Sequence, residues 1–363
     1  MRFAPAAFAA LAATAVAPPG PASASAFASA SAPAFAASSA APRRAPGRYQ
    51  AVRGDRVPGA PYTRYATTDR FGRAITFYLG DAPDSALALP LVVFVQGSGG
   101  HSLFATREGR ILGQFGHPGV LDAFYGRARL LVVEKPGVEF LTPIREPGEP
   151  PGSPEFCREQ TLPRWTEAVE AAIRAARALP RIRRDRMLVV GHSEGGLVAC
   201  RVARELGSVV THVASIAGGG PTQLYDVIAL TRAGKFMREA SDDPEERVRI
   251  LMRMWDRVLA DPMSAEKLFL GHPYRRWSTF AASSPIEELA PVRARIYIAQ
   301  GLLDDAADPG SADALYAQMR ALGKDVTYDR VPNADHDFAT PADRSTAGWK
   351  EMLGRLEAWF REE

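Results

Sequence analysis

Apolar and polar positions alternate in blocks along the chain from residue 62 onward. Seven short runs are rich in β-branched, aliphatic and aromatic residues, and several are almost continuously apolar: 74–80, 89–97, 129–137, 185–193, 209–219, 294–301 and 325–332. A continuous apolar run is typical of a strand that is buried on both faces, as in a parallel sheet covered by helices. These runs therefore predict the strands of a buried, mostly parallel sheet.

The segments between these runs show helical periodicity and recognisable ends. Residues 161–180 begin with Thr161 and a proline two residues later, and the pattern stops before Pro180. Residues 311–323 end at Gly323, a common helix-stop position, and residues 346–360 carry an apolar stripe. Strands that alternate with helices in this way predict an α/β fold with a doubly wound, mostly parallel sheet.

Residues 221–290 interrupt this alternation, because they contain no convincing strand. Within them, residues 245–260 carry an apolar stripe at helical spacing. We expect a helical insertion between two strands, and we expect the stripe to pack in a core rather than to contact substrate.

The first 47 residues differ in composition from the rest of the chain. Residues 1–26 combine one arginine with a short apolar stretch and small residues at cleavage-type spacing, which predicts a secretory signal peptide. The alternative is a disordered segment of low complexity, as expected for residues 27–47. We expect a single folded domain over residues 48–363 and a secreted or periplasmic protein.

Composition narrows the function classes. Of the 363 residues, 46% are hydrophobic and 23% are charged, as in soluble globular proteins. The net charge of +3 is spread without long blocks of one sign, so we expect no nucleic-acid partner. No segment after the first reaches about 18 uninterrupted apolar residues, so we expect no stable membrane insertion. Export would permit a disulfide between Cys157 and Cys200, although a small buried residue is favoured for Cys200; the pairing stays open.

The sequence GHSEGG, residues 191–196, follows a predicted strand and opens a predicted helix. A serine needs exposure and a nearby base to act as a nucleophile. The pattern Gly-x-Ser-x-Gly at a sharp turn from strand to helix provides the exposure, because the turn lifts the serine above the sheet. Ser193 is therefore the candidate nucleophile.

The other members of a catalytic triad should follow in the order acid, then histidine. Asp304 comes just after a predicted strand, and His336 lies in the loop after the next strand. His336 is expected to take the proton from Ser193, and Asp304 to orient the imidazole. Asp305 and Asp308 are alternatives for the acid, and His101 is the main alternative for the histidine.

The glycine-rich loop at residues 95–102 is the candidate oxyanion hole. A tetrahedral intermediate needs fixed hydrogen-bond donors, and we assign these to the backbone N–H groups of Ser98 and Glu194. Ser98 and Ser102 are themselves alternative nucleophiles, but neither lies in an elbow. The histidines and cysteines lack metal-ligand spacing, so we expect neither a metal nor a cofactor.

Together, QGSGG, GHSEGG, GLLDD and ADHDF resemble the motifs of the α/β-hydrolase superfamily over most of residues 62–363. The resemblance implies a cofactor-free serine hydrolase with a helical cap at residues 221–290, between the sixth and seventh sheet strands. Within the superfamily the chain looks most similar to secreted esterases and to prolyl-oligopeptidase-type serine peptidases. It departs from many members at Gln96, where they have a histidine before the glycine of the oxyanion loop.

These inferences predict a hydrolase of carboxylic esters that acts through an acyl-enzyme on Ser193. Its substrate is a small ester or, alternatively, a short peptide or amide, because the same residues serve both reactions. A catalytically silent binding protein on the same fold is the alternative from a different class.

Overall fold

The computed structural model describes residues 49–83, 87–144 and 149–362. The expected signal peptide (1–26), the expected linker (27–47) and the expected first residue of the domain (48) lie outside these ranges.

A nine-stranded sheet forms the centre of the described structure, in the order β1-β2-β3-β7-β4-β8-β9-β12-β13. Its strands are β1 (Val52–Arg56), β2 (Tyr62–Thr68), β3 (Ala74–Gly80), β4 (Leu89–Val95), β7 (Arg129–Val133), β8 (Ile182–His192), β9 (His212–Ile216), β12 (Arg295–Gly301) and β13 (Val326–Val331). In this spatial order, the six strands β7, β4, β8, β9, β12 and β13 run parallel to one another. The strands β1, β2 and β3 are attached antiparallel at one edge. All seven predicted strands are present, and the mostly parallel sheet is confirmed.

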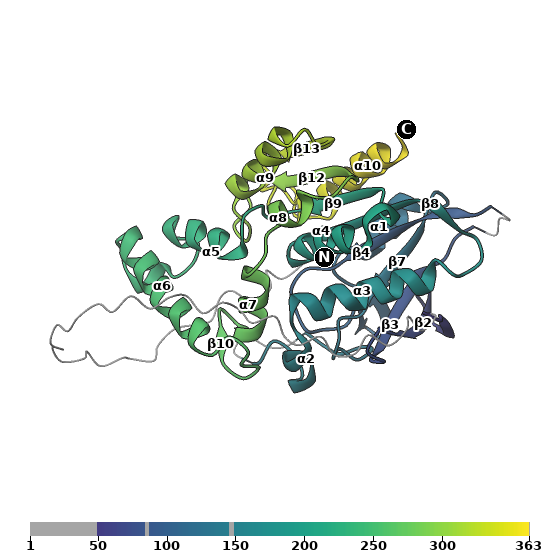
Figure 1. Ribbon diagram of the computed structural model, residues 1–363, viewed down its shortest axis with the longest axis horizontal. Helices are drawn as coiled ribbons and strands as arrows, with labels where there is room; N and C mark the ends of the chain where they lie inside the picture. Colours follow the sequence, from purple (N-terminus) through teal and green to yellow (C-terminus); the bar gives the residue numbers. More distant parts are fainter. Residues whose placement is uncertain (1–48, 84–86, 145–148, 363) are drawn as a thin grey trace.

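Helices cover both faces of this sheet (Figure 1). One face packs against α3 (Leu162–Ala176), α4 (Glu194–Leu206), α8 (Pro285–Leu289) and α9 (Pro309–Ala321). The other face packs against α1 (His117–Phe124) and α10 (Ala347–Arg361). In β8, Val189 faces the first group, whereas Leu188 and Val190 face the second. This alternation explains why residues 187–190 of β8, where both faces are covered, are all apolar, and the doubly wound arrangement is confirmed.

The insertion at residues 221–290 leaves the sheet after β9 and returns to it at β12. It contains α5 (Gln223–Arg232), η2 (Arg238–Ala240), α6 (Pro244–Ala260) and α7 (Tyr274–Ala281), and it ends with α8. In Figure 1, α5 and α6 lie beyond the body of the sheet. They share a small core with α7 that includes Leu251, Val258 and Trp277, so the apolar stripe of α6 packs as expected.

Two expectations for the insertion need correction. It contains a short hairpin of β10 (Leu268–Phe269) and β11 (His272–Pro273), and two-residue strands are too short to leave a periodic pattern in the sequence. It also lies between the seventh and eighth sheet strands along the chain, because β1 adds a strand before those counted from the resemblance.

The remaining elements connect these layers. They are the hairpin of β5 (Phe104–Arg107) and β6 (Arg110–Gly113), the helix α2 (Pro154–Glu159) and the turn η1 (Gly207–Val209).

Cys157 in α2 and Cys200 in α4 are both buried thiols, so the structure does not contain the disulfide left open above. Among the described helices, none has the length and apolar character needed to cross a membrane.

Candidate active site

Ser193 lies at the turn where β8 ends and α4 begins. Its backbone has φ 57° and ψ −125°, a conformation that non-glycine residues rarely adopt. The Ser193 N–H donates to the carbonyl of Ile216 in β9 at 2.9 Å, and its carbonyl accepts from Gly196 at 2.9 Å. The turn is therefore held from both sides in a strained conformation, as a nucleophile elbow requires.

The glycines around Ser193 are required by close backbone approaches. A Cβ atom at Gly191 would overlap the backbone carbonyl of Gly195. A Cβ atom at Gly195 would overlap the carbonyl oxygen of Val95, the last residue of β4. The Gly-x-Ser-x-Gly pattern thus has a steric cause, because α4 starts directly against the ends of β4 and β8.

His336 and Asp304 lie in the loops after β13 and β12, and the structure brings their side chains together. His336 Nδ1 lies 2.9 Å from Asp304 Oδ2 and 3.0 Å from Oδ1. The Asp304 carboxylate also accepts the N–H groups of Ala306 and Ala307 at 2.8 and 2.9 Å, and the amide of Gln300 at 2.8 Å. These bonds fix the carboxylate in place beside the imidazole.

This pairing changes the pKa values of His336 and Asp304 in the directions that favour an imidazolium beside a carboxylate. Burial alone would lower the pKa of His336, but the hydrogen-bonded Asp304 carboxylate, together with the charges of Asp337 and Asp305, outweighs it and raises the pKa to about 9. Burial would raise the pKa of Asp304, but the charge of His336 and the hydrogen bonds to the carboxylate lower it. The buried aspartate therefore stays ionised and favours the imidazolium form of His336.

The His336 loop lies next to the elbow through His192. The Nε2 atom of His192 is 3.0 Å from the backbone oxygen of His336, and the two rings are 4.9 Å apart between centroids. The Ser193 hydroxyl makes no hydrogen bond with the residues that the structure describes, including His336. The assignment of His336 as the base of Ser193 stays a prediction.

The alternative residues lie in other surroundings. His101 stacks on Phe115 with 4.2 Å between ring centroids, and burial lowers its pKa to about 4. Asp308 caps the start of α9, whereas the Ser102 hydroxyl donates to the buried carboxylate of Glu134 at 2.6 Å. None of these three pairs with His336 in the described structure.

The backbone N–H groups of Ser98 and Glu194 have no acceptor among the described residues, and the same holds for the N–H groups of Gly97, Gly99 and Gly195. The loop that carries Ser98 lies against the elbow, because a Cβ atom at Gly97 would be 3.1 Å from Ser193 Cβ and 3.6 Å from its Oγ. The assignment of Ser98 and Glu194 as the oxyanion donors is compatible with these contacts and stays a prediction.

Gln96, where the chain departs from many relatives, precedes this loop. Its side chain is fully buried, and neither amide atom has a hydrogen-bond partner in the described structure. It therefore contributes no hydrogen bond to the oxyanion loop.

A buried ion network surrounds the side chain of Glu194, which sequence reasoning did not anticipate. Lys135 Nζ, just after β7, donates to Glu194 Oε1 at 2.7 Å. Arg276, in the first turn of α7, donates to Oε2 at 2.8 and 2.9 Å. Burial alone would raise the pKa of Glu194, but these two cations lower it to about 2. Arg276 thus connects the helical insertion to the residue that follows the candidate nucleophile.

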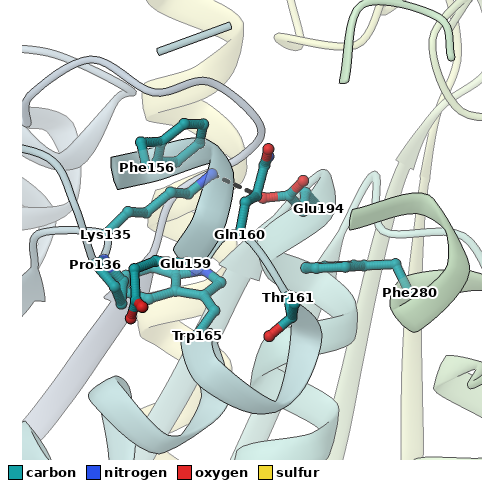
Figure 2. A pocket seen from close by; sticks show the side chains of 9 residues that line it. All are labelled: Lys135, Pro136, Phe156, Glu159, Gln160, Thr161, Trp165, Glu194 and Phe280. Carbon is teal, nitrogen blue, oxygen red and sulfur yellow. Dashed lines mark hydrogen bonds and ion pairs between the residues drawn. The ribbon is translucent and has the colours of Figure 1, made fainter. Parts of the chain in front are cut away.

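A small cavity lies against this network (Figure 2). Its lining includes Lys135 and Glu194, and the rings of Trp165 and Phe280 flank it. With a volume of about 10 Å³ it has room for roughly one water molecule, so it is not a substrate pocket. Glu159, the last residue of α2, and Gln160 also line it.

In the described ranges, no group of three or more His, Cys, Asp or Glu side chains is arranged to hold a metal ion. The site as the structure describes it contains a strained serine and, beside it, an imidazole paired with a carboxylate.

Three comparisons place this chain among known proteins. A model of the alpha/beta hydrolase family matches residues 92–347, and a search of the curated proteins found no match. Among solved structures, the chain is similar to Est1E from Butyrivibrio proteoclasticus with ferulic acid bound (TM-score 0.52, 16% identity, covering 79% of this chain and 96% of that one).

It is also similar to an acylaminoacyl peptidase from Pyrococcus horikoshii (TM-score 0.55, 13% identity, 84% of this chain and 42% of that one). A puromycin-hydrolyzing peptidase from Mycobacterium tuberculosis is similar as well (TM-score 0.50, 17% identity, 87% and 41%). At these identities the structural likenesses establish the fold. Since the family model spans more than half of the sequence, the chain belongs to the alpha/beta hydrolase family.

Proposed function

We propose that the protein is a serine hydrolase that cleaves carboxylic esters through an acyl-enzyme on Ser193. The observation that carries the proposal is the pairing of His336 with Asp304 in loops that lie beside a strained serine. Membership of the alpha/beta hydrolase family supports the same reaction class.

In the proposed reaction, neutral His336 removes the proton from the Ser193 hydroxyl as the oxygen attacks the ester carbonyl. The carbonyl oxygen becomes an oxyanion, which the N–H groups of Ser98 and Glu194 stabilise. His336 then donates its proton to the leaving alkoxide, and the alcohol departs. Water, activated by His336 in the same way, hydrolyses the acyl-enzyme and releases the carboxylic acid.

The extent of the structural match favours an ester over a peptide. The chain covers 96% of Est1E, whose structure holds ferulic acid, and an ester hydrolase releases a carboxylic acid of this kind. It covers about two fifths of the peptidases, which carry long additional segments. A short peptide or amide is therefore the second substrate class, and the same triad would serve it.

The test compares p-nitrophenyl esters with aminoacyl p-nitroanilides on purified protein, with Ser193→Ala as the background. We expect ester turnover that depends on Ser193 and exceeds anilide turnover at equal concentration. Turnover of anilides alone would replace the ester assignment by a peptidase. Equal rates in wild type and Ser193→Ala on both substrate classes would contradict a serine hydrolase.

A further inference from the structure

Lys135 is the only cation among the described residues that bonds to both segments of the candidate oxyanion hole. Its Nζ donates to the carbonyl oxygen of Gly97 at 2.7 Å and to Glu194 Oε1 at 2.7 Å. Its side chain is 3% exposed, and the Trp165 ring lies 6.0 Å from Nζ. Figure 2 shows Lys135 reaching across the cavity toward Glu194.

The carbonyl that Lys135 binds belongs to the same peptide unit as one of the two proposed oxyanion donors. The C=O of Gly97 and the N–H of Ser98 share one planar amide, and in a trans peptide they point in opposite directions. An ammonium that holds the oxygen on one side therefore fixes the direction of the N–H on the other. It also polarises the amide, which makes the N–H a stronger donor.

The second donor is fixed through the side chain of its own residue. The carboxylate of Glu194 is bonded to Lys135 on one oxygen and to Arg276 on the other, while its N–H has no acceptor among the described residues. The carboxylate is thus held from both sides, which fixes the position of Glu194 at the start of α4.

We propose that Lys135 is a positioning residue for the oxyanion hole: it orients the Gly97–Ser98 peptide and holds Glu194, so that both N–H groups point at the substrate oxygen. This inference rests on the proposed function. It assigns to Lys135 a role in stabilising the transition state and no contact with the substrate.

The test is Lys135→Met, with Lys324→Met as the matched control. Lys324 Nζ also donates to a backbone carbonyl, that of Val292 at 2.8 Å, but it lies before β13, at the opposite end of the parallel strands from the site. Active sites are counted by titration with a fluorophosphonate, so that kcat refers to correctly folded protein alone. The affinity of a trifluoromethyl ketone, which forms a tetrahedral adduct with an active serine, reports on the oxyanion hole.

For Lys135→Met we expect kcat per titrated site to fall by about 10- to 100-fold, less than the loss of a complete donor, while KM changes by less than about threefold. The affinity for the trifluoromethyl ketone should fall by the same factor as kcat/KM, whereas Lys324→Met should stay within about twofold of wild type.

A merely structural role for Lys135 would lower the number of titrated sites or the melting temperature and leave kcat per site unchanged, which would overturn the proposal. A fall in kcat without a loss of ketone affinity would also overturn it. If Lys135→Met does not fold, the double variant Lys135→Met/Glu194→Gln removes the carboxylate left with one partner, and the same loss of ketone affinity is expected. Absence of titratable sites in wild type would instead contradict the proposed function.

Discussion

His336 Nδ1 lies 2.9 Å from Asp304 Oδ2, although the two residues are 32 positions apart in the chain. The contact exists because β12 and β13 are parallel neighbours, so the loops after them leave the sheet at the same edge. It raises the pKa of His336 to about 9 against the effect of burial, which determines the protonation state of the proposed base.

The first prediction concerns the pH dependence of catalysis. Only neutral imidazole can accept the Ser193 proton, so kcat/KM should rise by about tenfold per pH unit below pH 9 and level off above it. Asp304→Asn removes the carboxylate that raises the pKa of His336, so its rising limb should move to lower pH and its maximal rate should fall. The measurement is a pH profile of kcat/KM for both proteins on one p-nitrophenyl ester. If kcat/KM of the wild type instead levelled off near pH 6.5, Asp304 would not raise the pKa of His336, and the prediction would be wrong.

The second prediction separates catalysis from folding. Ser193→Ala and His336→Ala should each lower kcat by at least about 1,000-fold, because nucleophile and base act as a unit. Ser208, exposed in η1, provides the control Ser208→Ala, which should retain wild-type turnover. Circular dichroism and thermal melting should show that all three variants fold. Turnover retained in either of the first two would remove that residue from the mechanism.

The third prediction compares two glycines. Gly195→Ala should destabilise the protein by several kcal/mol or prevent folding, because its Cβ atom would overlap the Val95 carbonyl. Gly354→Ala should instead stabilise by about 0.5–1 kcal/mol, since Gly354 lies inside α10 and an added Cβ atom would meet open space there. Urea unfolding measures both free energies. If the two substitutions changed the free energy of unfolding equally, the backbone at Gly195 could move away from Val95, and the steric account of the elbow would be wrong.

The fourth prediction concerns Asp226 in α5, whose Oδ1 accepts the N–H of Asp308 at 3.2 Å. Burial raises the pKa of Asp226 to about 7. The folded state therefore prefers the neutral carboxyl, so its stabilising contribution is complete below about pH 4 and is lost as the pH rises through 7. Asp226→Asn cannot ionise, and its melting temperature relative to wild type should increase between about pH 5 and pH 9. A difference that is constant over this range would contradict the raised pKa.

The sequence predicted the parallel part of the fold because most of its strands, such as β4, β7, β9 and β12, are buried on both faces. For the same reason it missed β1, whose five residues are all exposed, and β2, which has three exposed positions. The strands β1 and β2 are held by neighbouring backbone rather than by a continuous apolar run, so their sequences lack the signal that identified β3.

The structure pairs Asp304 with His336, two residues that the sequence selected from their places after neighbouring strands, and the role of Ser193 stays a prediction. Lys135 and Arg276 were missed because a charged residue in a loop or helix is usually exposed. The available signal was the position of Lys135, two residues after the buried strand β7 and at the edge where the other site loops meet. Its partner Glu194 could be identified only from the three-dimensional contacts.

The most direct test of the central claim is labelling of the folded protein with a fluorophosphonate, followed by peptide mass spectrometry. The account predicts one equivalent of label on Ser193, and strongly reduced labelling in His336→Ala, because the serine needs its base to react. Folded wild-type protein that takes up no label, or that carries it on a residue other than Ser193, would contradict the assignment of Ser193 as the nucleophile.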